Sequence, residues 1–441
     1  MQIRHSAASV VIAAALLFGC TSVAWAQTTG PGIIVPSSSI AGPNDAGVNA
    51  HTNILIMADP TLATATPSIP GVPGPPLTGY GYNTPGSIGC IYSLVLPQVP
   101  GCNPNLMSPG SNPSGGLHAI AIVDAFDDPA AVANFNSFAT QFGITGGSLV
   151  VTYAQPGGVL GVCTAANPGP VPPVDPTGGW EIEESLDIEY SHAMAPNAII
   201  YLVEAQSNSY NNLFCAVSYA QSLVSAAGGG EISMSWGGGE FGGETLYDLN
   251  FGFSPSRVVH VASSGDSPGV EYPCASPEVV CAGGTAVGRN PAYLNFTQET
   301  AWQVAGGGPS VYFPGRNAPD VSAIADPNTG VWILDNYRPF GTCASFLGGV
   351  VVGGNCWAII GGTSVASPVW AGIINRAGSF LNSGPSGTSG TELNRLYGDS
   401  TLSDVFNDIT IGSCGLYAGY LAGTGWDYCT GRGSPRGYSG K

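Results

Sequence analysis

The chain has 441 residues, of which 44% are hydrophobic and only 9% are charged, so a packed globular interior is expected. Lys and Arg total 10 against 28 Asp and Glu, which gives a formal net charge of −18 at pH 7. Because cationic side chains must neutralise phosphates, this balance excludes a nucleic-acid partner. A surplus of carboxylates loses its self-repulsion in acid, which suits a protein that works at low pH.

The N-terminus has the pattern of a secretory signal peptide, predicted over residues 1–26. Arg4 precedes the apolar run 7–19, and residues 24–26 (Ala-Trp-Ala) form a small-x-small cleavage site. The alternative is a lipoprotein, because Cys20 ends a sequence that resembles a lipobox. No later stretch reaches the ~18–20 apolar residues of a membrane helix. We therefore expect a monomer that is secreted, either outside the cell or into the periplasm.

Ten cysteines follow Cys20, and an even number in an exported chain predicts disulfide bonds. A metal site is less favoured, because the chain has neither CxxC nor HExxH spacing. Spacing alone does not prove connectivity, but near neighbours favour the pairs Cys90–Cys102, Cys274–Cys281, Cys343–Cys356 and Cys414–Cys429, which leaves Cys163–Cys215.

The amino-acid composition of the chain changes near residue 116. Residues 27–115 are rich in Pro, Gly, Ser and Asn and predict a loosely structured segment, either a short prosegment or a wrap held by Cys90–Cys102. Beyond them, strands are predicted at 118–124, 147–153, 198–205, 231–236 and 258–263, and helices at 129–142, 180–195 and 213–227. This alternation predicts an α/β fold with a doubly wound, mostly parallel sheet flanked by helices. We expect one catalytic domain over 116–435, followed by a tail at 436–441.

The sharpest motif is Gly-Gly-Thr-Ser-Val-Ala-Ser-Pro at residues 361–368. Its glycines permit a tight turn after an apolar run, and Pro368 fits only the first turn of the helix that follows. Ser364 would then lie at a helix N-terminus, where free N–H groups stabilise an oxyanion. The alternative is a helix cap without chemistry, but the flanking residues favour a nucleophile.

A serine nucleophile needs a base, and a pair of acids is the best candidate. Glu183 and Asp187 are four residues apart in the predicted helix 180–195, so they share one face. Like charges this close share a proton, so one acid can serve as base while the other orients it. The alternatives are a solvated acidic helix face and a hydrolase that uses His192 or His260.

A third acid, Asp266, follows the predicted strand 258–263 in the sequence Ser-Gly-Asp-Ser-Pro-Gly. The sites of doubly wound sheets lie at the carboxyl ends of the strands, so this acid is placed to face the site. The alternative is the side chain of an Asx turn. Asp124, at the end of the strand 118–124, either extends the acid network or caps its strand.

The order of these motifs resembles the sedolisin, or serine-carboxyl peptidase, family. The resemblance runs from about residue 115 to 435 and extends to the motifs at 122–129, 233–237, 272–277, 283–285 and 316–322. It implies a subtilisin-like fold and a secreted, acid-active peptidase with protein or peptide substrates. Ser364 would be the nucleophile, Glu183 the general base and Asp187 its partner. A protonated Asp266 and the Ser364 N–H would stabilise the oxyanion.

The resemblance also implies a substrate contact and a structural Ca²⁺. Trp236 would border the substrate cleft, although a core position is the alternative. The calcium ligands would be Asp408, Ile409, Gly423, Gly425 and Asp427, and the alternative is a pair of turns pinned by Cys414–Cys429. The family's precursors carry a large folded prodomain, which residues 27–115 do not resemble. A catalytically inactive secreted binding protein on the same fold is the competing function.

Overall fold

The computed structural model describes residues 27–30, 32–69, 71–96, 98–252, 257–339, 341–378, 381, 389–398, 402–416 and 419–441. The predicted signal peptide and Cys20 lie outside the described residues.

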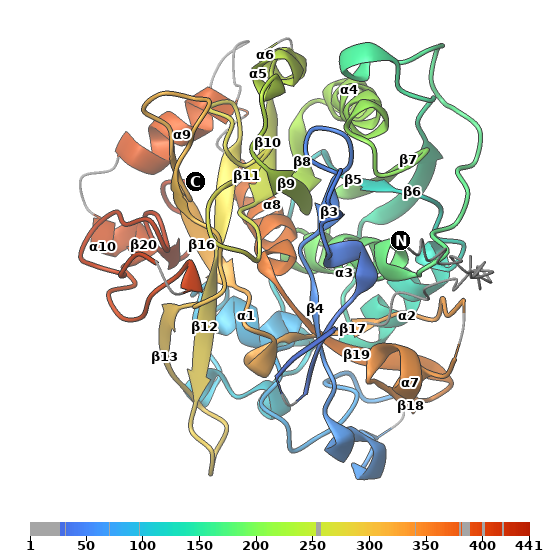
Figure 1. The fold of residues 1–441 in the computed structure, drawn as a ribbon. Helices are drawn as coiled ribbons and strands as arrows, with labels where there is room; N and C mark the ends of the chain where they lie inside the picture. Colours follow the sequence, from blue (N-terminus) through green and yellow to red (C-terminus); the bar gives the residue numbers. More distant parts are fainter. Residues whose placement is uncertain are drawn as a thin grey trace, which may run out of the picture.

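An eight-stranded sheet forms the centre of the molecule (Figure 1). Its strands run in the order β13-β12-β10-β8-β5-β7-β6, and β16 also pairs with β12. Every pairing is parallel except β12 with β13. The bounds are β5 (Ala119–Ala125), β6 (Ser148–Tyr153), β7 (Ile199–Ala205), β8 (Gly230–Met234), β10 (Val258–Ser263), β12 (Val280–Arg289), β13 (Phe296–Ala301) and β16 (Val321–Ile324).

Helices cover both faces of this sheet, which confirms the predicted doubly wound fold. Alternate residues of β5 divide between two cores: Ile120 and Ile122 pack with α2, α3 and α8, whereas Ala121 packs with α4 on the opposite face. The predicted strands and helices all form within a few residues of their expected bounds. The helices are α2 (Ala131–Phe142), α3 (Gly179–Met194), α4 (Tyr210–Ala226), α8 (Ala366–Ala377) and α9 (Ser389–Gly398).

Shorter elements surround this centre. The strands are β1 (Gln27–Gly30), β2 (Ile33–Val35), β3 (His51–Thr52), β4 (Leu55–Met57), β9 (Trp236–Gly239), β11 (Glu271–Tyr272), β14 (Gly308–Pro309), β15 (Asn317–Ala318), β17 (Val331–Leu334), β18 (Val350–Val352), β19 (Asn355–Gly361), β20 (Phe406–Asn407) and β21 (Ser434–Pro435). The short helices are α1 (Pro85–Ile91), α5 (Glu244–Tyr247), α6 (Leu249–Gly252), α7 (Cys343–Leu347) and α10 (Leu402–Val405).

The N-terminal segment is not loosely structured, which corrects the expectation for residues 27–115. β1, β2 and β4 join β19 and β17 in a second sheet, and β3 pairs with β9. Ile54, Ile56 and Leu62 are buried in the main core. Figure 1 shows the segment, coloured blue, running in front of α3. Its elements were missed because each strand is two to four residues long and its partners are mostly distant in the sequence.

All five predicted disulfides are present: Cys90–Cys102, Cys163–Cys215, Cys274–Cys281, Cys343–Cys356 and Cys414–Cys429. The tail also packs against the fold, since Lys441 Nζ donates a hydrogen bond to Val405 O at 2.6 Å. Within the described ranges, no helix has the length and apolar character that a bilayer crossing needs.

Candidate active site

Ser364 lies between β19 and α8, on a turn that its neighbouring glycine makes possible. Gly362 has a φ of 106°, and a Cβ at this position would lie 2.0 Å from Asn53 O and 2.7 Å from Asp266 Oδ2. Only glycine fits so close an approach. Ser364 is fully buried, and its hydroxyl lies 2.9 Å from Glu183 Oε2 in a hydrogen bond that the hydroxyl donates. The serine therefore contacts one of the predicted acids directly.

Glu183 and Asp187 lie one turn apart on α3 and are both fully buried, so they are not a solvated acidic face. Asp187 Oδ1 accepts a hydrogen bond from Ser235 Oγ at 2.9 Å. Among the described residues, Glu183 Oε1 and Asp187 Oδ2 have no partner. Burial, followed by the charges of Asp187 and Asp124, raises the pKa of Glu183 well above its usual value, and burial does the same for Asp187. The pair therefore holds a proton far above the pH at which exposed acids lose theirs.

The acid network extends beyond the predicted pair. Asp124 is fully buried at the end of β5, and burial, followed by the charges of Asp187 and Glu204, raises its pKa. Glu204 is its register partner on β7, and burial raises the pKa of Glu204 to about 10. Glu184 is also buried beside them. Sequence reasoning missed Glu204, although two acids at the carboxyl ends of neighbouring parallel strands are a usable signal.

Asp266 lies in the loop after β10, close to Gly362 and Thr363. Its Oδ1 accepts hydrogen bonds from Thr363 N at 2.8 Å and Thr363 Oγ1 at 2.9 Å. Its Oδ2 is buried and has no partner among the described residues. Burial raises the pKa of Asp266 to about 8, so the group is neutral in acid. Because Oδ1 already accepts two hydrogen bonds, the proton belongs on Oδ2, where it is free to donate.

Asn53, which sequence reasoning missed entirely, lies against the serine. Its carbonyl oxygen accepts a hydrogen bond from Ser364 N at 3.1 Å, and its own N–H donates to Ser364 Oγ at 3.2 Å. The Ser364 N–H was predicted to bind an oxyanion. The structure places a peptide carbonyl oxygen at that donor.

Comparison with known proteins identifies the family of this chain. Residues 159–401, more than half of the chain, match the family model described as the subtilase family, and they include all four predicted catalytic residues. The chain belongs to the subtilase family. It is 30% identical over 312 residues to kumamolisin from Bacillus sp. (strain MN-32), a match that covers 59% of this chain and 51% of kumamolisin. The chain thus spans about half the length of this relative.

The fold resembles that of Pseudomonas sedolisin, a serine-carboxyl proteinase solved in complex with two molecules of pseudo-iodotyrostatin. The TM-score is 0.58 at 23% identity, over 83% of this chain and 96% of that structure. This likeness shows the fold, and the kumamolisin match agrees with the resemblance to the sedolisin family that the motifs indicated.

The predicted substrate contact of this subtilase takes a different position from the one expected, and the two histidines considered as alternative bases make other contacts. The Trp236 side chain is fully buried in the core, and its indole donates a hydrogen bond to Val123 O at 2.7 Å, so it does not border a substrate cleft. His192 packs against the Phe135 ring, with ring centroids 4.4 Å apart, and His260 is hydrogen bonded to Ser389. Burial lowers the pKa of His192 to about 4 and that of His260 to about 3. The side chain that accepts the hydrogen bond from the Ser364 hydroxyl is the carboxylate of Glu183.

The two predicted calcium loops lie together. Asp408 Oδ2 accepts a hydrogen bond from Gly425 N at 3.0 Å, and Asp427 Oδ2 accepts one from Gly423 N at 2.9 Å. The five predicted ligands offer only oxygen donors, which suits a hard cation such as Ca²⁺ and does not suit zinc. No cluster of three or more His, Cys, Asp or Glu side chains suited to a metal occurs in the described part of the chain.

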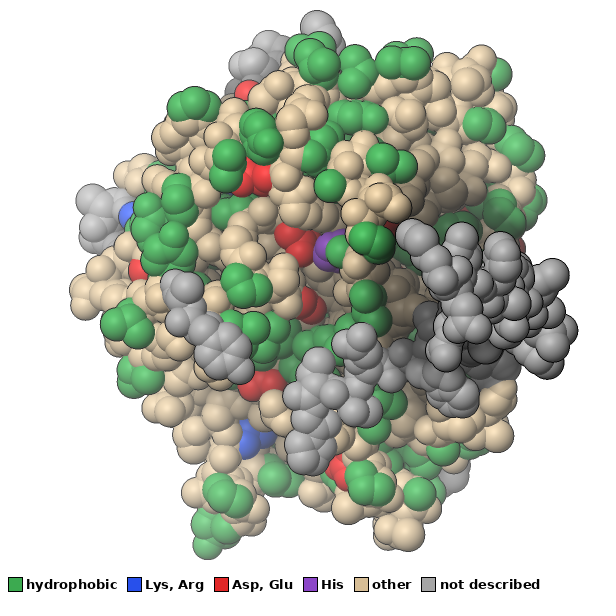
Figure 2. Space-filling view, in the orientation of Figure 1, with side chains coloured by type: hydrophobic (Ala, Val, Ile, Leu, Met, Phe, Trp, Pro, Cys, Tyr) green, Lys and Arg blue, Asp and Glu red, His purple; other side chains and the backbone are tan. Residues whose placement is uncertain are grey.

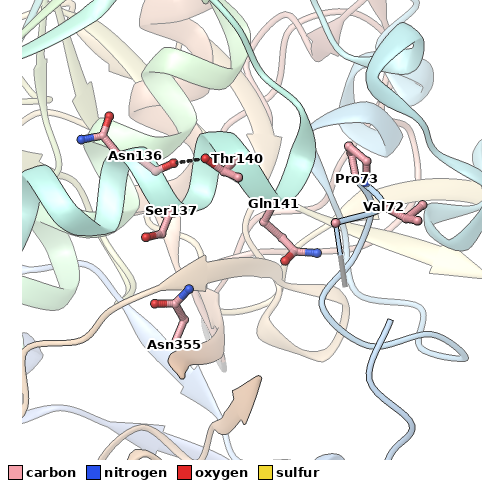
Figure 3. A pocket seen from close by; sticks show the side chains of 8 residues that line it. Val72, Pro73, Asn136, Ser137, Thr140, Gln141 and Asn355 are labelled. Carbon is pink, nitrogen blue, oxygen red and sulfur yellow. Dashed lines mark hydrogen bonds between the residues drawn. The ribbon is translucent and has the colours of Figure 1, made fainter. Parts of the chain in front are cut away.

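Two cavities differ in their position and in the side chains that line them. One of about 580 Å³ borders Asp266, Ile54 and Trp302, next to the site. Another of about 310 Å³ lies between residues 71–73, the outer side of α2 and Asn355 (Figure 3). Its lining in Figure 3 consists of amide, hydroxyl and small apolar side chains, none of them acidic or basic. On the face with β3, Figure 2 shows acidic side chains gathered around a histidine, with few Lys or Arg nearby.

Proposed function

We propose that this protein is a secreted serine-carboxyl peptidase that hydrolyses peptide bonds in acid through an acyl-enzyme on Ser364. The observation that carries the proposal is the 2.9 Å hydrogen bond from Ser364 Oγ to Glu183 Oε2, made by a fully buried serine to a fully buried acid pair. Membership of the subtilase family supports the reaction class.

The proposed reaction uses three acids in different protonation states. Glu183, as the ionised member of the pair, takes the Ser364 proton as Oγ attacks the substrate carbonyl carbon. Asp187 keeps the one proton that the acid pair holds before the reaction. The Ser364 N–H and a protonated Asp266 stabilise the oxyanion. Glu183 then protonates the leaving amine, and water hydrolyses the ester by the reverse sequence.

The buried acids indicate a fold that is more stable in acid than at neutral pH. Burial raises the pKa of Asp335 to about 7 and that of Glu244 to about 8, in addition to Asp266 and Glu204. A carboxyl group whose pKa is higher in the folded chain binds more protons than in the unfolded chain between the two pKa values. Each such group therefore stabilises the fold below its unfolded pKa, near 4, and this contribution is lost as pH rises towards 7–8.

A peptide-cleavage assay tests the proposed activity. The purified chain should cleave a fluorogenic peptide library between about pH 3 and 6, where Asp266 is protonated, and Ser364→Ala should show no activity above background. A folded wild-type chain that cleaves no peptide across this range would indicate the inactive binding protein instead. Activity that is absent in acid and appears only above pH 8, where Asp266 is ionised, would contradict the role of Asp266.

We also propose that Asp408 and Asp427, with the carbonyl groups of Ile409, Gly423 and Gly425, bind one structural Ca²⁺. A ligand that binds only the folded chain raises its melting temperature. EDTA should therefore lower the Tm by several degrees, and added Ca²⁺ should restore it. Asp408→Asn should remove this response, whereas Asp404→Asn, a nearby exposed acid, should keep it. An unchanged Tm in EDTA would contradict the site.

A further inference from the structure

Ser235 contacts both the acid pair and the nucleophile. It lies between β8 and β9, in the Ser-Met-Ser-Trp-Gly motif at 233–237, and is fully buried. Its hydroxyl donates to Asp187 Oδ1 at 2.9 Å, and Ser364 O lies 3.2 Å from the same hydroxyl. A serine hydroxyl has one proton, so it donates to one of these acceptors at a time. The carboxyl group of Asp187 is the nearer acceptor and, when ionised, the stronger one.

The backbone of Ser235 also contacts the nucleophile. Its carbonyl oxygen lies 3.0 Å from Ser364 Oγ, almost the same distance as Glu183 Oε2 at 2.9 Å. The Ser364 hydroxyl has one proton for these two acceptors. It donates to Glu183 when this acid is ionised, because a charged acceptor is the stronger one, and to Ser235 O when Glu183 is protonated at Oε2. Ser235 therefore lies beside each group that exchanges a proton in the attack.

The hydrogen bond from Ser235 determines which oxygen of Asp187 is available to a proton. Asp187 Oδ1 accepts this bond, whereas Asp187 Oδ2 has no partner within the described ranges. A carboxyl proton belongs on the oxygen that does not already accept, which here is Oδ2. In Glu183, Oε2 accepts from Ser364, and Oε1 is the oxygen without a partner there. Ser235 and Ser364 thus occupy one oxygen of each acid and leave Oδ2 and Oε1 for the proton that the pair holds.

The other titratable groups around the acid pair are acids as well. Those that face the pair, or its neighbour at the end of β5, are Asp124 on β5, Asp266 in the loop after β10, Glu184 on α3 and Glu204 on β7. None of these groups stabilises a negative charge on the pair. Burial raises the pKa of Asp187 well above its usual value, and the hydrogen bond from Ser235 acts in the opposite direction. The pair therefore depends on this hydroxyl for a donor to its charged form.

We infer that Ser235 is a positioning residue of this peptidase, whose hydroxyl fixes Asp187 and keeps Glu183 Oε2 free to take the Ser364 proton. This inference rests on the proposed peptidase function. The hydroxyl proton of Ser235 stays on Ser235 throughout the reaction, because this group acts only as a donor to Asp187. The proton that moves is that of Ser364, which passes to Glu183 and then to the leaving amine.

Steady-state kinetics of Ser235→Ala on a fluorogenic peptide test this inference. The variant leaves a buried acceptor of Asp187 without its donor, so kcat should fall ~10-fold while KM stays within ~2-fold of wild type. Ser235→Cys should lie between the two proteins, because a thiol is a weaker donor than a hydroxyl. The matched control is Ser191→Ala, another buried serine, on α3, whose hydroxyl has no partner among the described residues. It should keep both constants, and melting curves establish that each variant is folded.

The pH profile gives a readout that a merely loosened fold would not change. A hydrogen bond to the charged form of a carboxyl group lowers its pKa, so the loss of the Ser235 hydroxyl should raise the pKa of the pair. Because the pair must be ionised once to act as base, Ser235→Ala should lose activity at a higher pH than wild type does on the acid side. At the pH where wild type keeps half of its maximal kcat/KM there, the variant should lose ~3-fold or more beyond the loss at its own maximum.

A double-mutant cycle shows whether Ser235 acts through Asp187. In a chain that carries Asp187→Ala, the further change Ser235→Ala should lower kcat/KM less than ~2-fold, because the acceptor is already gone. Full additivity of the two losses overturns the inference. A Ser235→Ala chain that matches Ser191→Ala in rate and pH profile also overturns it, and leaves the proposed function standing. A folded wild-type chain without peptidase activity overturns the proposed function and this inference with it.

Discussion

Glu183→Gln is expected to lower kcat/KM by about 10⁴-fold or more, close to the loss caused by Ser364→Ala. The amide of Gln has nearly the shape of the carboxylate and still accepts the hydrogen bond from Ser364 Oγ, but it cannot take up the proton. The serine is then a neutral alcohol without a base. Initial rates on a fluorogenic peptide, measured at the pH of maximal wild-type activity, give this ratio.

Two further variants decide between a carboxylate and a histidine as the base. His192→Ala should keep activity within a few-fold, because His192 packs against Phe135. The double variant Glu183→Gln/Ser364→Ala should be no less active than Ser364→Ala alone, since groups that act as one unit are not additive. An active Glu183→Gln together with an inactive, folded His192→Ala would reverse the assignment.

The residues that sequence could predict are those whose neighbours in the chain define their position. Ser364 is placed by the glycines before it and Pro368 after it, and Glu183 and Asp187 by the period of one helix. The central sheet follows for the same reason, because strands that are buried on both faces read as continuous apolar runs. Disulfide pairs were accessible because most of the cysteines are near neighbours.

The residues that sequence could not predict are placed by pairing between distant segments. Asn53 contacts Ser364 across 311 positions and Glu271 across 218, and no local pattern encodes either contact. β3 and β4 are too short to show an alternation of apolar and polar residues. Trp236 was misplaced for a related reason: its backbone in β9 does pair with β3 at the site, but its side chain points into the core.

The protonated Asp266 carboxyl group is responsible for the second large effect. Asp266→Ala should lower kcat in acid by about 10²–10³-fold, the usual loss when one oxyanion donor is removed. Asp266→Asn should stay within ~10-fold of wild type there, because its amide nitrogen donates as the protonated acid does. Its carbonyl oxygen can accept the two hydrogen bonds from Thr363 that Asp266 Oδ1 now accepts.

The pH profiles of these variants separate the charge of Asp266 from its shape. In wild type, kcat/KM should fall as pH rises through the pKa of Asp266, which burial raises to about 8, because the ionised group repels the oxyanion. Asn has no proton to lose, so Asp266→Asn should not show this fall. A decline that is the same in both proteins would assign it to another group. Full activity of Asp266→Ala in acid would leave the Ser364 N–H as the donor that matters, and the protonated carboxyl would have no part in the reaction.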